Sequence, residues 1–195
     1  MDTTPAWQLQ PPSPTSRLWL FLLLVALPVA IAAGAIAYAG DDPGPKQLIG
    51  GSPLLTNALI LAGILALTLA IHWLIARAMR RHAVTLDSDG LAITTSFYSR
   101  RLGWRELQLS QARIVDLGER TELKPVLKTN GASLPGFHSG WFRLRNLHRA
   151  FVATVGGTRL VYLPTTAGYD LLLQPRQPQA FVQRLAELAP PGARD

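Results

Sequence analysis

Residues 53–87 read PLLTNALILAGILALTLAIHWLIARAMRRHAVTLD, and the pattern of this stretch changes twice. Residues 53–76 carry no charge and measure about 36 Å as a helix, enough to cross a hydrocarbon core of about 30 Å. Three arginines follow in residues 77–82, and from there apolar and polar residues alternate as in a strand. The stretch therefore predicts a transmembrane helix at 53–76, a basic juxtamembrane linker at 77–82 and a β domain from residue 83.

A second uncharged run lies upstream at residues 18–39 and measures about 33 Å as a helix, so it predicts another transmembrane helix. Pro28 should bend this helix mildly, because proline removes a backbone hydrogen bond. Residues 40–52 are rich in Gly, Pro and Asp and predict a loop. Residues 1–17 are rich in proline, and we expect them to be disordered. The chain thus begins with a two-helix transmembrane hairpin.

The charges beside the two runs predict the orientation of the hairpin. Arg17 precedes the first run and the basic linker follows the second, whereas the loop between them is net acidic. Because cations favour the cytoplasmic side, both termini are expected in the cytoplasm and residues 40–52 are expected to form an extracytoplasmic loop. The alternative is that residues 18–39 form a cleaved signal peptide ending in Ala37-Tyr38-Ala39. The long proline-rich lead, with one cation, and the length of the run favour a membrane span.

Small residues recur at every fourth position in both runs, at Ala26, Ala30 and Gly34 and at Ala58, Ala62, Ala66 and Ala70. This spacing lets helix backbones approach closely in lipid, either within the hairpin or between two copies of the chain. It is also compatible with the high alanine content of such helices. His72 lies one turn from the end of the second run, beside Trp73. We interpret it as an interfacial anchor, because neither run offers a second ionisable group for a proton relay.

Composition removes several classes of function. The chain has no cysteine, so disulfides, thiolate metal sites and cysteine nucleophiles are excluded. His138 and His148 have no supporting carboxylate cluster between them, and the serine of Gly136–Gly140 is one place too late for a nucleophile elbow. No glycine-rich phosphate loop occurs either. We expect no metal, no cofactor and no enzymatic activity.

The C-terminal part is basic, with 17 Lys and Arg against 9 Asp and Glu from residue 77 onward, a net charge of +8. These cations are scattered along the expected strands and do not gather on one helix, and the domain is tethered to a membrane. This arrangement argues against a nucleic-acid partner.

Alternating apolar residues predict a mainly β domain over residues 83–189. The expected strands are 82–87, 91–98, 109–117 (preceded by a segment at 104–107), 141–145, 150–155, 159–163 and 169–173. Residues 118–140 are expected to be looser, with turn signals at Asn130-Gly131 and Pro135-Gly136. Residues 177–188 predict an amphipathic helix with Pro178 in its first turn and with Phe181, Val182, Leu185, Leu188 and Ala189 on its core face. Short strands and one closing helix predict a compact antiparallel sandwich or barrel, followed by a tail at 190–195.

This outline resembles the pleckstrin-homology (PH) superfold, and several short motifs resemble the bacterial PH-domain family. The motifs are Lys128-Thr129-Asn130-Gly131, Leu134-Pro135-Gly136-Phe137, Gly140-Trp141-Phe142, Val161-Tyr162-Leu163-Pro164, Gly168-Tyr169 and Leu171-Leu172-Leu173. The resemblance covers about half the chain. It implies a PH-like domain of the kind that often follows membrane helices. The expected fold is therefore the two-helix transmembrane hairpin plus a mainly-β PH-like sandwich or barrel closed by a C-terminal helix. It also implies a bacterial cytoplasmic (inner) membrane protein that acts as a binding or assembly module.

Two groups of residues are candidate sites. The first would contact the lipid surface and consists of Arg77, Arg80, Arg81, Arg100 and Arg101, with Arg105 as a possible extension. The turn at 87–90, Asp-Ser-Asp-Gly, is acidic, which disfavours the phosphoinositide mode of other PH domains at that turn. The second group would line a groove or serve the fold, and consists of Asn130, Gly131, Pro135, Gly136, Gly140, Trp141, Tyr162 and Tyr169.

The sequence therefore predicts a non-enzymatic, membrane-anchored PH-like module at the cytoplasmic face. Its expected partners are another protein, a second copy of the chain or an anionic lipid surface. The alternative is an accessory subunit of a membrane enzyme or transporter complex, held there by the transmembrane helices.

Overall fold

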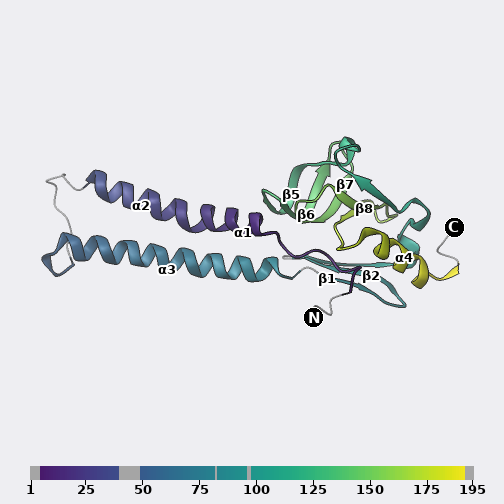
Figure 1. Cartoon of the computed structure of the whole chain (residues 1–195), viewed down its shortest axis with the longest axis horizontal. Coiled ribbons are helices and arrows are strands. Elements are labelled where there is room, and N and C mark those ends of the chain that lie inside the picture. The colour runs from purple at the N-terminus through teal and green to yellow at the C-terminus, as the bar shows by residue number, and fades with distance from the viewer. Residues whose placement is uncertain (1–4, 40–48, 82, 96–97, 192–195) are drawn as a thin grey trace. The chain divides into compact units, whose positions relative to one another are not determined.

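The computed structural model describes residues 5–39, 49–81, 83–95 and 98–191 (Figure 1). The chain divides into two compact units. One is the helical unit, residues 17–77, and the other is the β unit, residues 1–16 together with 78–195.

Two long helical segments account for the helical unit. The first is continuous through α1 (Pro14–Phe21), a π-helical turn η1 (Leu22–Ala26) and α2 (Leu27–Tyr38). The second is α3 (Pro53–Met79), preceded by the short 3-10 turn η3 (Ile49–Gly51). Both segments begin with a serine followed by a proline: Ser13 accepts the backbone N–H of Ser16 (3.1 Å), and Ser52 accepts that of Leu55 (3.3 Å). These are N-cap contacts, and proline at the next position has no amide to leave unpaired.

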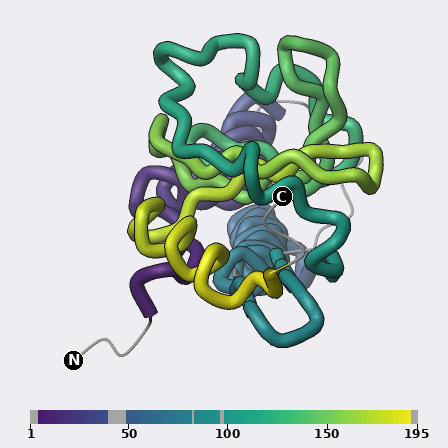
Figure 2. Tube along the Cα trace, turned by 90° about the vertical axis from the view of Figure 1, so that its right-hand side faces the viewer, coloured from purple at the N-terminus to yellow at the C-terminus, as the bar shows by residue number. Residues whose placement is uncertain are grey.

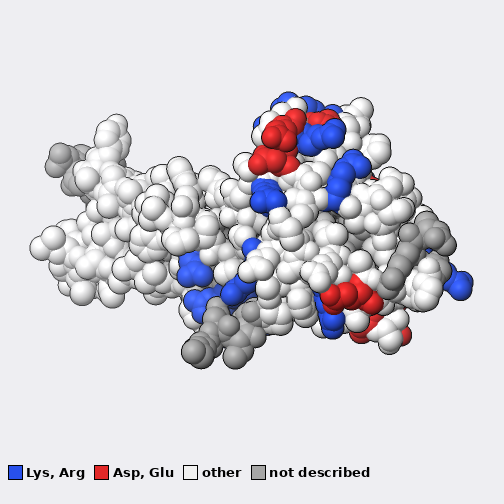
Figure 3. Space-filling model, turned by 45° about the vertical axis from the view of Figure 1, so that its right-hand side comes forward, with Lys and Arg blue, Asp and Glu red and all other residues white. Residues whose placement is uncertain are grey.

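Both segments are long and apolar enough to cross a membrane, with 25 and 27 residues and hydropathies of 2.7 and 2.4. The first segment begins a few residues before the uncharged run at 18–39, and the second ends a few residues after the run at 53–76. The surface over these helices is almost uncharged in the view of Figure 3. The π-helical turn ends two residues before Pro28, and the N–H of Leu27 binds the carbonyl of Leu22. The wider turn accommodates the proline ring inside a continuous helix. Most of the expected loop at 40–52 lies outside the described residues.

The β unit contains two sheets. The smaller has the order β1-β2-β3, with β1 (Ala83–Leu86), β2 (Gly90–Thr94) and β3 (Ser99–Gly103). The larger has the order β4-β8-β9-β7-β6-β5. Its strands are β4 (Arg113–Asp116), β5 (Pro125–Leu134), β6 (Phe137–Leu144), β7 (Arg149–Thr154), β8 (Arg159–Leu163) and β9 (Asp170–Leu173). Neighbouring strands are antiparallel except for β7 and β9, which are parallel.

Strands β7, β8 and β9 of the larger sheet are buried on both faces, whereas the edge strand β5 is mostly exposed. On one face, β7, β8 and β9 share a core with the smaller sheet and with α4 (Pro178–Leu188). On the other face, a second core contains residues of β4, β6, β7, β8 and β9 and is closed by Leu123 in η6 (Thr121–Leu123). Strand β8 shows the consequence: Val161 and Leu163 point to the first core, and Leu160 and Tyr162 to the second. A strand buried on both faces carries apolar or aromatic side chains at successive positions, as residues 160–163 do.

The C-terminal helix matches its prediction closely. Helix α4 has Pro178 at its first position, and Phe181, Leu185 and Ala189 lie buried in the first core. Val182 and Leu188 pack beside them. The prediction of a mainly β domain with a C-terminal helix packed on its core is thereby confirmed.

The residues before the first helix differ from the disorder expected at 1–17. Residues 5–12, named here the N-terminal strap, pair with residues 174–177, the segment that joins β9 to α4 (Figure 2). Leu9 is buried in the first core and forms a bridge with Pro175. The N–H of Gln10 donates to the carbonyl of Gln174, and the N–H of Arg176 donates to that of Gln8. The prolines prevent a regular helix or strand in this segment. The apolar side chain of Leu9 is nevertheless buried in the first core, and this burial holds the strap in place. Residues 1–4 lie outside the described residues.

Several expected strands also differ. Residues 99–103 form β3, and residues 104–111 form two 3-10 turns, η4 (Trp104–Glu106) and η5 (Leu109–Gln111), in place of a strand. Residues 125–134 form β5, so that Asn130-Gly131 lies inside a strand and is not a turn. The turn at Pro135-Gly136 is confirmed, because it joins β5 to β6. The sheet is not wholly antiparallel, since β7 and β9 run in the same direction.

Candidate functional site

An open pocket of about 480 Å³ lies where β6 ends and where β7 and β9 begin, and it is the candidate functional site. We name it the arginine pocket. Its lining residues are Arg143, His148, Arg149, Thr165, Gly168, Tyr169 and Asp170. They come from the β6–β7 turn, from the start of β9 and from the segment before it. The volume is in the range of small-ligand sites.

Two arginines stand side by side in this pocket. Arg143 of β6 lies directly opposite Arg149 of β7 in the antiparallel register. Directly opposed residues have Cβ atoms about 5 Å apart, and like charges at such positions are destabilising. Neither guanidinium pairs with a carboxylate among the residues that the structure describes. The Nη1 atom of Arg143 donates to the carbonyl of Leu147 at 2.9 Å, which holds this side chain in place.

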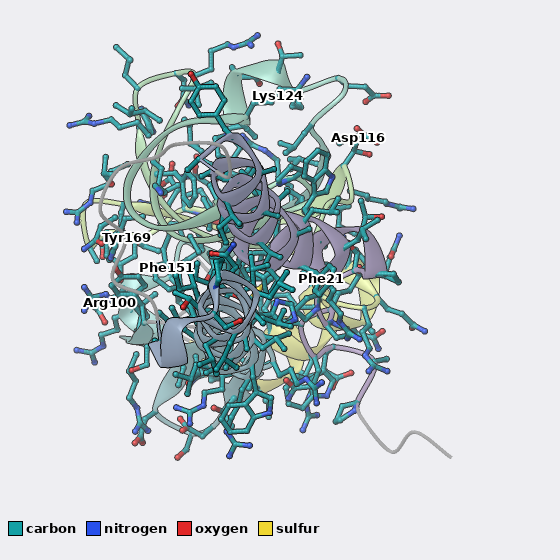
Figure 4. All side chains as sticks on the ribbon, turned by 90° about the vertical axis from the view of Figure 1, so that its left-hand side faces the viewer. Phe21, Arg100, Asp116, Lys124, Phe151 and Tyr169 are labelled. Atoms are coloured by element: carbon teal, nitrogen blue, oxygen red, sulfur yellow. The ribbon has the colours of Figure 1, made fainter. Side chains whose placement is uncertain are left out.

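Trp141 forms an aromatic floor beside the pocket. The guanidinium of Arg149 lies 4.2 Å from the centroid of its ring, and that of Arg100 lies 5.0 Å from it. Tyr169 meets the same ring edge-on at 4.8 Å between centroids, and Phe151 does so at 5.2 Å. Figure 4 shows Arg100, Phe151 and Tyr169 on one side of the β unit. Stacking on an aromatic ring orients a guanidinium while leaving its N–H groups available.

A buried carboxylate orders the other wall. Asp170 is 8% exposed, and its Oδ2 accepts the hydroxyl of Tyr162 at 2.8 Å and lies 3.2 Å from Nδ1 of His148. Burial, followed by the hydrogen bond to Asp170, raises the pKa of Tyr162 to about 12, so that its hydroxyl remains a donor. Burial also raises the pKa of Tyr169. Oδ2 of Asp170 thus has two partners, Tyr162 and His148, and no ion pair joins Asp170 to Arg143 or Arg149 among the described residues.

The predicted lipid-contact arginines fall in different surroundings. Arg77 lies in the last turn of α3, 5.8 Å from the ring of Trp73, and Arg80 and Arg81 follow as exposed residues. Arg100 belongs to the Trp141 cluster, as described above. Arg101, its neighbour on β3, points elsewhere and binds Asp87 at 2.9 Å and Asp89 at 3.0 Å.

The two carboxylates of the β1–β2 turn thus neutralise Arg101. A hydrogen bond from the backbone of Asp89 lowers the pKa of Asp87, which keeps this turn anionic. None of the five predicted arginines lines the arginine pocket, and Arg100 lies beside it through its contact with Trp141. Arg105 is exposed within η4.

The predicted groove residues separate into two sets. Trp141, Tyr162 and Tyr169 lie in or next to the arginine pocket. The other five belong to the β5–β6 hairpin: Asn130 accepts the hydroxyl of Tyr98, Gly131 and Gly140 face each other across the strands, and Pro135 and Gly136 form the turn. The carbonyl of Gly136 accepts the hydroxyl of Ser16 at 2.9 Å. These contacts are structural.

Four pocket residues were not singled out from the sequence: Arg143, Arg149, Thr165 and Asp170. His148 was considered there only as a metal ligand. One signal for them was present. Arg143 and Arg149 are placed on either side of a hairpin whose strands were predicted, at positions that pair when the turn spans 145–148. The sequence around Asp170 does not indicate that it belongs to a site, because Asp170 reaches the pocket only through the parallel pairing of β9 with β7.

Comparison with known proteins assigns the β unit. Residues 82–189 match the model of the family described as Bacterial PH domain, which confirms the resemblance seen in the motifs. No curated protein and no solved structure matches the chain.

Proposed function

The chain belongs to the bacterial PH-domain family, and from this premise we propose that it is a membrane-anchored, non-enzymatic binding module. In this proposal the two apolar helices span the bacterial inner membrane, and the β unit binds its partner at the cytoplasmic face. The observation that carries the proposal is the arginine pocket, a preformed site with two opposed arginines that have no carboxylate partner among the described residues.

The N-terminal strap supports a hairpin with both ends on one side. The strap precedes the first apolar helix and β1 follows the second, and both belong to the β unit. Because the β unit contains residues from before the first helix and from after the second, both of these parts of the chain have to lie in the same compartment. Arg17 before the first helix and Arg77, Arg80 and Arg81 at the end of the second favour the cytoplasm for that compartment.

The topology can be tested without background labelling, because the chain contains no cysteine. In Asp42→Cys the new thiol would lie in the extracytoplasmic loop, and in Ser88→Cys it would lie in the β unit. A maleimide that cannot cross membranes should label Asp42→Cys in intact spheroplasts and should label Ser88→Cys only after lysis. The reverse pattern would overturn the proposed orientation.

The binding role is tested by purifying the full-length chain in a mild detergent with its associated proteins and lipids. Three forms are compared: the natural chain, the Arg143→Gln/Arg149→Gln double variant, and a chain whose two helices are replaced by an unrelated hairpin. Retention of a partner should depend on the two arginines and should survive the helix replacement. Loss of the partner only on helix replacement would instead indicate an accessory subunit held by its helices.

A further inference from the structure

We propose that the arginine pocket binds a phosphate group, either on a lipid headgroup or on a soluble phosphorylated molecule. The inference deepens the proposed binding function by naming the class of ligand. It places the ligand at the ends of β6, β7 and β9, away from the β1–β2 turn, where Arg101 is already neutralised by Asp87 and Asp89.

The first argument is the unfavourable pairing of Arg143 with Arg149. Arg143 and Arg149 are directly opposed in the sheet, where like charges repel each other, and folding alone does not require either of them at an exposed hairpin end. An anion placed between them removes the repulsion. A tetrahedral phosphate has oxygens enough to accept N–H groups from both arginines at once, in the forked geometry that guanidinium favours.

The second argument is that both arginines are held in place before any ligand arrives. Arg143 is fixed by its bond to the carbonyl of Leu147, and Arg149 by its position over Trp141. Each is anchored at one group or face, so further N–H donors remain for a ligand. Binding then costs less side-chain entropy than it would with free arginines.

The third argument is the charge and donor balance of the pocket. Asp170 is the sole carboxylate among the lining residues, and its Oδ2 atom already binds Tyr162 and His148. His148 contacts Asp170 through Nδ1, which leaves Nε2 as its second ring nitrogen. Tyr169 adds a hydroxyl group, and Arg100 adds a third positive charge beside Trp141. The hydroxyl of Thr165 already donates to the carbonyl of Tyr169. The lining is thus net positive and rich in donors, as a phosphate site requires.

The test uses the full-length chain purified in a neutral detergent, with inorganic phosphate titrated by calorimetry at constant ionic strength. The natural chain should bind phosphate saturably. Arg143→Gln and Arg149→Gln should each weaken binding by about tenfold or more, because each removes hydrogen bonds to a charged ligand. Arg145→Gln is the matched control: it removes the same charge from the same turn, outside the pocket lining, and should leave the affinity unchanged.

Thermal unfolding of the same samples guards against loss of the fold. Because each variant removes one of two opposed cations, it should unfold at or above the temperature of the natural chain. If either glutamine variant fails to fold, Arg143→Lys and Arg149→Lys take its place. They keep the charge but lose the forked geometry, and they should weaken phosphate binding severalfold. Absence of saturable binding, or equal affinity in natural chain and pocket variants, would overturn the proposal.

A second arm identifies the source of the phosphate. The chain is placed in nanodiscs of phosphatidylcholine, or of phosphatidylcholine with phosphatidic acid, and the phosphate titration is repeated. A severalfold loss of apparent affinity for inorganic phosphate in the nanodiscs that contain phosphatidic acid shows that a lipid headgroup fills the pocket. An unchanged affinity supports a soluble phosphorylated ligand. The calorimetric result in detergent does not depend on membrane topology or on a protein partner. Failure of the phosphate site can therefore be distinguished from failure of the proposed binding function.

Discussion

The side chain of Gln8 binds both backbone groups of Val84, a residue 76 positions further along the chain. Its Nε2 donates to the carbonyl of Val84 at 2.7 Å, and its Oε1 accepts the N–H of Val84 at 3.0 Å. Gln8 precedes the first apolar helix, and Val84 lies in β1, directly after the second. The pair therefore ties the two flanks of the helical unit together at the edge of the smaller sheet, where β1 has no second neighbouring strand.

The N-terminal strap should contribute measurably to the stability of the β unit. Leu9 is 4% exposed, so Leu9→Ala should lower the free energy of unfolding by about 2–5 kcal/mol. Urea unfolding of the detergent-solubilised chain, followed by tryptophan fluorescence, measures this change. Leu127→Ala is the control, because Leu127 is 59% exposed on β5, and a change within about 0.5 kcal/mol is expected there. Equal effects of the two substitutions would mean that the strap does not pack on the core.

The glycine pair of the β5–β6 hairpin should not tolerate side chains. Gly131 has φ +149°, and a Cβ atom there would lie 2.2 Å from the carbonyl oxygen of Ser139. Gly140 has φ +119°, and a Cβ atom there would lie 2.6 Å from the carbonyl oxygen of Asn130. Either change to alanine should cost at least about 1–3 kcal/mol of unfolding free energy from backbone strain alone.

The same unfolding measurement applies to this pair, with Gly103→Ala as control. Gly103 has φ −69°, and the nearest atom to its added Cβ would lie at 3.6 Å, so alanine should be accepted there. Stable folding of both hairpin variants would contradict the close approach of β5 and β6.

Tyr162 should stabilise the fold through its bond to Asp170. Tyr162→Phe leaves a buried carboxylate with His148 as its remaining side-chain partner, and should cost about 1.5–3 kcal/mol. In the Asp170→Asn background the same substitution should cost less, because the charged acceptor is gone. Since the folded-state pKa of Tyr162 is raised to about 12, this contribution is complete below the ordinary value of 10.0 and is lost as the pH rises toward 12. Equal costs in both backgrounds would contradict the pairing.

His138 should make stability depend on pH at the acidic side. Burial lowers the pKa of His138 below its ordinary value of 6.5, so the folded state favours the neutral ring. The unfolded chain then binds more protons, and stability falls as the pH drops from 6.5 toward the folded-state pKa. Above 6.5 the contribution of His138 is constant. Unfolding measured across this range should give a smaller acidic decline for His138→Gln than for the natural chain, and an identical decline would refute the assignment.

Prediction from sequence succeeded where one segment carries its own pattern. Helix α4 was recognised because its apolar residues recur at helical spacing, and β7, β8 and β9 because they are short apolar runs between turn residues. Strand β5 was missed because it lies at an edge of its sheet, is mostly exposed and contains two register shifts, so no alternation shows. Strand β3 was missed because Ser99, Arg100 and Arg101 are all exposed.

The candidate site shows the same division. Trp141, Tyr162 and Tyr169 were selected from family-like motifs, and the structure gathers them at the arginine pocket. Arg143 and Arg149 become a site only through the register of β6 on β7. Asp170 joins them only through the parallel pairing of β9. Such pairings are long-range, and each residue by itself resembles an ordinary surface charge.

Two properties of this protein follow from its sequence alone: helices apolar enough to cross a membrane, and a basic, mainly β domain behind them. Both depend on hydrophobicity and periodicity, which act locally along the chain. Tertiary structure alone decided that the proline-rich N-terminus is held by Val84 and Pro175, and that arginines from two strands share one pocket. These depend on hydrogen bonds and burial between distant segments, whose free energy exists only once the sheets have formed.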